Sequence, residues 1–254
     1  MKKLFLLLGT WAAFAAGAID DLGMTAEVFR DGADELPYRQ ALIGESKPGK
    51  YALLLFLHGA GERGNDNLKQ LINNFPDVMA YCRKHDLKIV VLAPQCPEEC
   101  RWVEVDWGRK SHTIPQKPSK PMAMLLKLLD QKCAEFAVDP DRIYVTGISM
   151  GGYGSWDILC RRPDLFAGAL ILCGGADVKE APRLTEIPIL FYHGNNDTIV
   201  PVVRSRKMAK ALEKAGGRKF EYREIDAGHF IWIPVYRDAK NFDWLFSQKR
   251  HQEK

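Results

Sequence analysis

The sequence predicts an α/β fold in which a mostly parallel central sheet carries helices on both faces. Continuous apolar runs at residues 51–57 and 88–94 support this class, because strands that helices cover on both faces lose the polar alternation of half-exposed strands. Further strand patterns at residues 142–146, 168–173 and 187–194 alternate with helix-like segments. Strands that alternate with helices along a chain favour parallel pairing.

The start of the chain predicts an export signal. Residues 1–18 combine Lys2 and Lys3, an apolar stretch and small residues before a cleavage position after Ala18. The apolar stretch is too short for a comfortable membrane span, and an uncleaved anchor is the alternative interpretation. We therefore expect an exported protein, periplasmic or extracellular, in which residues 19–254 form a single domain with no stable membrane insertion.

The composition argues against some partners. The 254 residues are 46% hydrophobic, enough for one sizeable core, and carry a formal net charge of +4. Two of those positive charges belong to the leader, so the remaining chain is nearly neutral and we expect no nucleic acid partner. The basic residues from Arg204 to Lys210 are interpreted as the solvated face of a helix.

The cysteines permit disulfide bonds without requiring them, since an exported chain meets an oxidising compartment. Cys96 and Cys100 lie close enough in sequence for a bridge to close a small loop. The other four cysteines fall at helix-like or strand-end positions, where buried free thiols are common. None of the six histidines joins the cysteines at the spacing of a zinc site, so we expect no metal.

In chain order, residues 38–43 alternate polar and apolar side chains, as an edge strand does. The buried run that follows ends in a loop, residues 58–67, with three glycines within six positions. In an open α/β sheet, such a loop at the carboxyl end of a central strand approaches a ligand closely. We expect His58 to hold this loop by hydrogen bonds, and Glu62 and Arg63 to form a stabilising charged pair.

The middle of the chain predicts two helices with an irregular segment between them. Residues 77–86 and 122–137 have helical periodicity, and residues 95–118 have no clear period. A long irregular segment in a compact domain is usually functional or mobile. Its two tryptophans, Trp102 and Trp107, either line a substrate pocket or pack beneath the segment.

Ser149 occupies a sharp turn between the strand at residues 142–146 and a helix pattern at residues 153–160. Gly147 and Gly151 flank it at −2 and +2, where larger side chains would collide with the strand and the helix. Such an elbow lifts the hydroxyl above the end of the sheet and aims the first N–H groups of the helix at any negative charge that forms there. A glycine-rich turn with no chemical role is the alternative interpretation.

The C-terminal third supplies two further strand-end polar residues. Asp197 follows the strand at residues 187–194 and lies at the level of the elbow, although aspartate is also a common turn residue. A helix pattern at residues 202–215 precedes an alternating edge strand at residues 219–225. His229 lies in the loop after that strand, where a histidine can also be an ordinary polar surface residue, and a final helix pattern extends from about residue 234 to 246.

The order Ser149, Asp197, His229, each at one rim of a parallel sheet, resembles the α/β-hydrolase superfamily over residues 36–250. Within it the chain is most similar to exported bacterial esterases related to polyhydroxybutyrate depolymerases, feruloyl and acetylxylan esterases and predicted peptidases. The resemblance rests on these segments: residues 57–64, 93–97 and 139–152, His193-Gly194 with Asp197, and Gly228-His229 with Trp232.

The resemblance implies a single α/β-hydrolase catalytic domain that cleaves a small-molecule or glycan-linked ester through an acyl-enzyme, with short-chain acyl, feruloyl or acetyl groups as candidates and with no cofactor. Ser149 is the expected nucleophile, His229 the base and Asp197 the acid that orients it, with Asp226 or Asp177 as substitutes for Asp197. The backbone N–H groups of Met150 and Ala60 are the expected oxyanion donors. The expected substrate pocket is lined by three tryptophans: Trp102, Trp107 and Trp232.

Two other functions are compatible with the same residues. A serine peptidase would use the same triad, but we find no acidic pair to hold a peptide amine and no propeller domain. A non-catalytic binding protein on this fold commonly lacks the serine or the histidine, whereas Ser149 and His229 are both present here.

Overall fold

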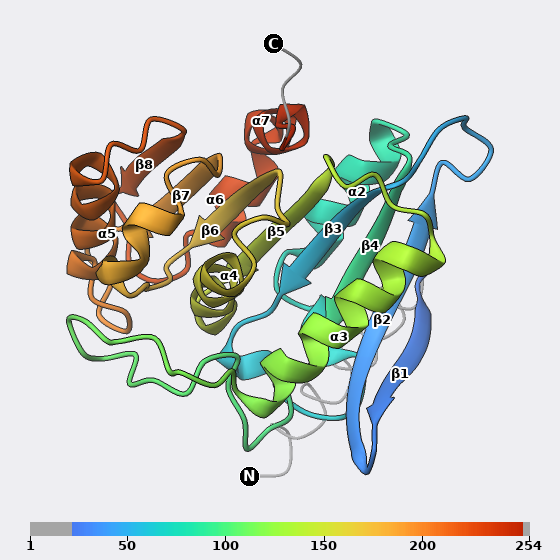
Figure 1. The fold of residues 1–254 in the computed structure, drawn as a ribbon, viewed down its shortest axis with the longest axis horizontal. Coiled ribbons are helices and arrows are strands. Elements are labelled where there is room, and N and C mark those ends of the chain that lie inside the picture. The colour runs from blue at the N-terminus through green and yellow to red at the C-terminus, as the bar shows by residue number, and fades with distance from the viewer. Residues whose placement is uncertain (1–21, 251–254) are drawn as a thin grey trace, which may run out of the picture.

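The computed structural model describes residues 22–250, so the expected export signal lies outside the described residues. Within them the chain forms an eight-stranded sheet in the order β1-β2-β4-β3-β5-β6-β7-β8 (Figure 1). The strands are β1 (Thr25–Asp31), β2 (Asp34–Ile43), β3 (Ala52–Leu57), β4 (Ile89–Pro94), β5 (Ile143–Ile148), β6 (Gly168–Leu172), β7 (Ile189–Gly194) and β8 (Phe220–Ile225). The α-helices are α2 (Phe75–Lys84), α3 (Lys120–Glu135), α4 (Met150–Arg161), α5 (Val203–Lys214), α6 (Trp232–Arg237) and α7 (Ala239–Ser247), and the 3-10 helices are η1 (Ala60–Glu62), η2 (Lys69–Leu71) and η3 (Val178–Arg183).

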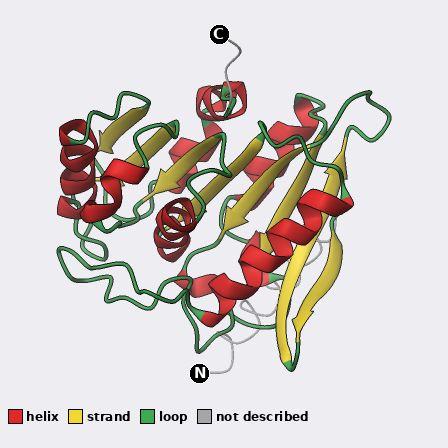
Figure 2. Cartoon of the chain, in the orientation of Figure 1, coloured by secondary structure: helices red, strands yellow, loops and turns green. Residues whose placement is uncertain are grey.

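The sheet is mostly parallel, as the sequence predicts. β2 pairs antiparallel with β1 and with β4, and every pairing from β4 through β3, β5, β6 and β7 to β8 is parallel. Helices cover both faces, with α3 and α4 on the near side of Figure 2 and α2 and α6 behind the sheet. The fold class is confirmed.

The apolar side chains of β3 divide between two cores because successive side chains of a strand point to opposite faces. Leu53, Leu55 and Leu57 join the core beneath α3 and α4. Leu54 and Phe56 join the other core, with side chains of α2, α6 and α7. All six residues of β3 are buried, which explains the continuous apolar run in the sequence.

Residues 38–43 do form a strand, but the prediction that this strand lies at the edge of the sheet is wrong. It belongs to β2, and β1 pairs along its outer side with Thr25 opposite Gln40, so β1 is the edge. Asp31 and Asp34 close this hairpin around Gly32, whose φ of +64° suits a tight turn. β1 is mostly exposed, and its mixed sequence gave no strand signal.

The predicted final helix is divided in two. Asp238 ends α6 in an extended conformation, and its side chain accepts a hydrogen bond from the backbone N–H of Lys240 as the N-cap of α7. In the part of the chain that the structure describes, no helix has the length and apolar character needed to cross a membrane.

Residues 95–119 contain no helix or strand. This segment, green in Figure 1, runs along the carboxyl ends of the parallel strands, past α4 and toward α5. The loops that follow β3, β5 and β7 reach the same end of the sheet, so the candidate site lies beside this segment.

Candidate active site

Ser149 lies in a strained turn between β5 and α4. Its backbone has φ +53° and ψ −115°, a conformation that non-glycine residues rarely adopt. A Cβ at Gly147 would lie 2.4 Å from the carbonyl oxygen of Gly151, and a Cβ at Gly151 would lie 1.9 Å from that of Leu57. The small residues at −2 and +2 therefore have the steric role that the sequence predicts.

The structure brings together the serine, histidine and aspartate that the sequence singled out. Nε2 of His229 lies 2.8 Å from Oγ of Ser149, and Nδ1 of His229 lies 2.6 Å from Oδ2 of Asp197. The histidine is 7% exposed, whereas Ser149 is half-buried. A hydroxyl, an imidazole and a carboxylate in this arrangement can move a proton from the serine to the histidine.

The Asp197 carboxylate is fully buried and has several hydrogen-bond donors. Oδ1 accepts from the backbone N–H of Ile199 at 2.9 Å and of Val200 at 2.8 Å. Oδ2 faces both His229 and the buried His193. Burial alone would raise the pKa of Asp197, but the hydrogen bonds from His193, His229 and Val200 outweigh it and hold the pKa well below the usual range. The carboxylate therefore stays ionised.

The two substitute acids have other partners. Asp226 accepts a hydrogen bond from the side chain of Asn196 at 2.9 Å. Asp177 accepts from the backbone N–H groups of Ile114 and Lys179. Of these three carboxylates, Asp197 is the one that lies within hydrogen-bond distance of His229.

Among the described residues, one group of side chains has donor atoms close enough together to hold a metal ion. It consists of Cys173, His193 and Asp197, whose donor atoms all lie within 4.8 Å of one another. Cysteine–histidine spacing missed this group because Cys173 follows β6, whereas His193 and Asp197 lie four residues apart at the end of β7 and in the turn after it. Its donors already have partners. His193 contacts Ser205 and the Val200 carbonyl oxygen, and burial raises the pKa of the Cys173 thiol so that it stays protonated. These contacts indicate that Cys173 and His193 support Asp197 and are not free to bind a metal ion.

His58 holds the glycine-rich loop, as the sequence predicts. Its Nε2 accepts a hydrogen bond from the backbone N–H of Cys96 at 2.9 Å, so its Nδ1 carries the proton and donates to the carbonyl oxygen of Gly59 at 2.6 Å. Burial lowers the pKa of His58 to about 4, which keeps the ring neutral. Ala60 comes next and begins η1, and Met150 begins α4.

Glu62 and Arg63 do not form the predicted charged pair. The Glu62 carboxylate accepts a hydrogen bond from the side chain of Asn73. Arg63 donates instead to the carbonyl oxygen of Ala60 at 2.9 Å and to that of Cys100 at 3.3 Å. The two side chains point to different parts of the loop and stabilise it separately.

The tryptophans differ in their surroundings. Trp102 is 0% exposed, and its Nε1 donates to the carbonyl oxygen of His58 at 3.3 Å, so the prediction that it lines a substrate pocket is wrong. Trp107 is half-buried beneath the guanidinium of Arg101. Trp232 is 4% exposed and packs edge-on against His229 with ring centroids 5.4 Å apart.

Arg204 anchors the irregular segment and is 2% exposed, so the interpretation of this residue as part of a solvated helix face is wrong. Its guanidinium donates to the carbonyl oxygen of Asp106 and to Nδ1 of His112, each at 2.7 Å. Tyr153, one turn after Ser149, donates its hydroxyl hydrogen to the carbonyl oxygen of Trp107. These contacts fasten the segment to α4 and α5.

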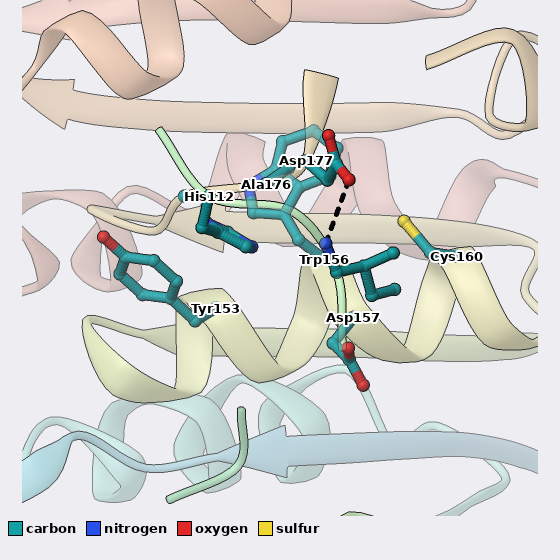
Figure 3. Close-up of a pocket in the computed structure, with 9 residues that line it drawn as sticks. His112, Tyr153, Trp156, Asp157, Cys160, Ala176 and Asp177 are labelled. Carbon is teal, nitrogen blue, oxygen red and sulfur yellow. Dashed lines mark hydrogen bonds between the residues drawn. The ribbon is translucent and has the colours of Figure 1, made fainter. Parts of the chain in front are cut away.

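A small pocket lies beneath this anchored segment (Figure 3). His112, Tyr153 and Trp156 contribute to its lining, and the Asp177 carboxylate accepts the backbone N–H of Ile114 at 2.9 Å beside it. Its volume of ≈ 10 Å³ is about the space of one water molecule, so it is too small for an acyl group.

All six cysteines lie among the described residues, and each is a free thiol in the structure. Cys96 is buried beside His58, and Cys100 is half-buried. The loop between them is closed by a hydrogen bond from the backbone N–H of Cys100 to the carbonyl oxygen of Pro97 at 3.0 Å.

A family model described as Phospholipase/Carboxylesterase matches residues 39–243, which include Ser149, Asp197 and His229. The chain belongs to this family. Membership confirms the resemblance to the α/β-hydrolase superfamily that the motif order indicates, and the family contains carboxylesterase-type hydrolases.

Two relatives are similar to this chain in sequence, and one of them is also similar in fold. The crystal structure of a thermostable esterase superposes with a TM-score of 0.82 at 37% identity, covering 91% of this chain and 64% of that one. Poly(3-hydroxybutyrate) depolymerase of Ralstonia pickettii is 30% identical over 146 residues, 55% of this chain and 28% of the depolymerase. The chain thus spans less than two thirds of either relative.

A third relative is named a probable inactive carboxylesterase and comes from Oryza sativa subsp. japonica. It is 23% identical over 209 residues, which cover 71% of this chain and 83% of the rice protein. Family membership alone therefore does not establish activity, and the geometry around Ser149 carries the functional argument.

Proposed function

We propose that this protein is an exported serine hydrolase that cleaves carboxylic esters through an acyl-enzyme. The observation that carries the proposal is the continuous hydrogen-bonded chain from Ser149 through His229 to Asp197. This chain is complete, which favours catalysis over a binding protein on the same fold. The strained elbow and the ionised Asp197 are further support, because both prepare the serine for attack.

In the proposed reaction, Ser149 Oγ attacks the ester carbonyl while His229 Nε2 takes its proton. Asp197 fixes the protonated Nδ1 of His229 and stabilises the imidazolium. The backbone N–H groups of Met150 and Ala60 bind the oxyanion of the tetrahedral intermediate. His229 then protonates the departing alcohol, which leaves the acyl group on Ser149. Water attacks this acyl-enzyme while His229 takes a proton from it, and His229 returns that proton to Ser149 Oγ as the carboxylic acid departs.

The surface beside His229 favours a small ester with an apolar or aromatic group. Phe230 is 67% exposed, and its ring packs edge-on against His229 at 5.8 Å and Trp232 at 5.0 Å between centroids. Ile199, next to the Asp197 loop, is 49% exposed. Exposed apolar side chains beside a polar site are typical of a binding surface. We propose short-chain acyl, acetyl or feruloyl esters, free or glycan-linked, as substrates.

The test is hydrolysis of p-nitrophenyl acetate, butyrate and octanoate, methyl ferulate and a dipeptide p-nitroanilide. Ser149→Ala should lower kcat by about 10⁵- to 10⁶-fold without unfolding the protein. Ser247→Ala removes a distant hydroxyl that donates to the carbonyl oxygen of Trp244, so it is the matched control and should keep full activity.

The outcomes separate the functions. Ester turnover that Ser149→Ala removes supports the esterase, and selective cleavage of the anilide by Ser149 indicates the peptidase. Undiminished turnover in Ser149→Ala would overturn the assignment. A wild-type protein that hydrolyses nothing and resists a fluorophosphonate would indicate the binding protein.

A further inference from the structure

The loop that carries His229 has to cross two strand ends before it reaches Ser149. Ser149 follows β5 and His229 lies in the loop after β8, and β6 and β7 lie between these two strands (Figure 1). Neighbouring strands of a sheet are about 4.8 Å apart, so the chain has to bridge three such spacings. The groups that support the loop along this path therefore decide where the imidazole lies.

The end of β7 supports the first part of the loop through backbone contacts. The backbone N–H of Asn196 donates to the carbonyl oxygen of Ala227 at 3.0 Å. A Cβ at Gly194 would lie 2.0 Å from the carbonyl oxygen of Gly228, so the two main chains lie close together there. These contacts hold the main chain as far as Gly228, the residue before His229.

The end of β6 supports the main chain of His229 through a side chain. Sγ of Cys173, the residue that follows β6, donates to the carbonyl oxygen of His229 at 3.3 Å. Cys173 is fully buried, and burial raises the pKa of its thiol, so the sulfur keeps the proton that it donates. The carbonyl oxygen of Leu172, one residue earlier, accepts the backbone N–H of Ser149 at 2.9 Å. Two consecutive residues therefore contact the main chains of the candidate nucleophile and of the candidate base.

The backbone at Cys173 turns in a way that glycine adopts more easily. Its φ is +48°, in the left-handed region where residues with a side chain are uncommon. The turn brings Gly174 against α4, where a Cβ at Gly174 would lie 2.5 Å from the carbonyl carbon of Gly152. A glycine in place of Cys173 would allow the same packing, so the packing does not explain the cysteine. A strained residue beside a candidate site calls for a role for its side chain.

We propose that Cys173 is a positioning residue that places His229 beside Ser149 through the hydrogen bond from its thiol to the His229 carbonyl oxygen. This role rests on the proposed function. The thiol acts on the main chain of His229, whereas Asp197 acts on its ring, so the two fix different parts of the residue. The backbone N–H of Ile231 donates to the same carbonyl oxygen at 2.9 Å, but it belongs to the same loop and moves with it.

Two substitutions separate the hydrogen bond of the thiol from its packing. Cys173→Ala removes the donor, and Cys173→Ser replaces it with a hydroxyl donor. A hydroxyl group packs an apolar core no better than a methyl group does. Packing alone therefore predicts that Cys173→Ser is no more active than Cys173→Ala, whereas positioning predicts that Cys173→Ser is the more active variant.

The experiment measures the steady-state kinetics of both variants and of wild type on the best ester of the panel above. We expect Cys173→Ala to lower kcat by about three- to tenfold, the factor that one hydrogen bond typically contributes, with KM within about twofold. Cys173→Ser should restore kcat to within about twofold of wild type. The rate at which a fluorophosphonate labels Ser149 should follow the same order, because labelling also uses His229 as the base.

Hydrogen exchange gives a readout that needs no substrate. The backbone N–H groups of residues 226–231 should exchange faster in Cys173→Ala than in wild type, because one restraint on this loop is lost. Cys173→Ser should return them toward the wild-type rate. A general loss of packing would instead raise the exchange rates across the whole core.

Cys82 is the matched control. It is also a fully buried cysteine, and it lies in α2, behind the sheet in Figure 2. Cys82→Ala and Cys82→Ser should lose stability with kcat unchanged.

Three outcomes would overturn the role of Cys173: kcat of Cys173→Ala within twofold of wild type, Cys173→Ser no more active than Cys173→Ala, or a rise in KM alone. A wild type inert to both esters and fluorophosphonate would overturn the proposed function and this role with it. An active wild type matched by Cys173→Ala overturns only the positioning role.

Discussion

Nε2 of His193 lies 3.2 Å from Oδ2 of Asp197, the carboxylate oxygen that Nδ1 of His229 approaches to 2.6 Å. His193 is the penultimate residue of β7, and its side chain is fully buried. Its Nδ1 lies 2.7 Å from the hydroxyl oxygen of Ser205, and its Nε2 lies 2.9 Å from the carbonyl oxygen of Val200. A carbonyl only accepts, so Nε2 carries the proton and Ser205 donates to Nδ1. That proton is donated to the Val200 carbonyl, and the same nitrogen faces Oδ2 of Asp197, so His193 is a second histidine in contact with the acid.

His193→Ala should lower kcat on the best ester by about tenfold. It removes the contact that helps to lower the pKa of Asp197 and the hydrogen bond to the carbonyl of Val200, whose backbone N–H holds the carboxylate. The loss should be smaller than that of Asp197→Asn, because His229 and two backbone N–H groups still hold the carboxylate. Steady-state kinetics measure both variants. His193→Gln, which can replace the Nε2 donor, should recover part of the rate, and unchanged kcat in folded His193→Ala would contradict the prediction.

The strand-end residues could be predicted from sequence because parallel strands end at one edge of a sheet. Ser149 and Asp197 each follow an apolar strand pattern, and such a pattern can be recognised from its own residues alone. β1 could not be found in this way, because an exposed strand has no apolar period and exists only through its pairing with β2. Sequence and structure therefore agree best where burial is high.

The supporting side chains could not be predicted because contacts between distant segments define them. Arg204 has the sequence surroundings of a solvated basic helix face, yet Asp106 and His112, about a hundred residues away, enclose it. His193 is the exception, because Asp197 lies only four residues after it and contacts it across the turn that follows β7. A strand that ends in His-Gly followed by aspartate was the available signal for His193.

Trp102 should be important for stability. Its side chain is fully buried within the core beneath α3 and α4. Trp102→Ala should lower the free energy of unfolding by about 3–5 kcal/mol, the usual cost of removing a large aromatic side chain from a core. Urea unfolding followed by circular dichroism measures this change. The half-buried Trp107 is the internal comparison, and a loss for Trp102→Ala no larger than that for Trp107→Ala would contradict the burial argument.

The contact between Arg204 and His112 makes stability depend on pH. Nδ1 of His112 accepts from a guanidinium that is always charged, so protonation at Nδ1 would break the bond. Burial first, and then Arg204, lower the pKa of His112 to about 4, against a smaller opposing effect of Asp177. The unfolded chain therefore binds this proton at a higher pH than the folded chain does.

As the pH falls from about 6.5 to about 4, His112 binds a proton in the unfolded state but not in the folded state. The free energy of unfolding therefore decreases over this range. His58 has a pKa lowered in the same direction, and several carboxyl groups titrate near the lower limit, so wild type alone does not isolate His112. His112→Gln keeps an oxygen acceptor for Arg204 and removes the titration. Urea unfolding of both proteins at pH 7 and pH 4 should show wild type losing more stability than His112→Gln on acidification. A difference between the two proteins that stays constant across this range would contradict the assignment of the lowered pKa to His112.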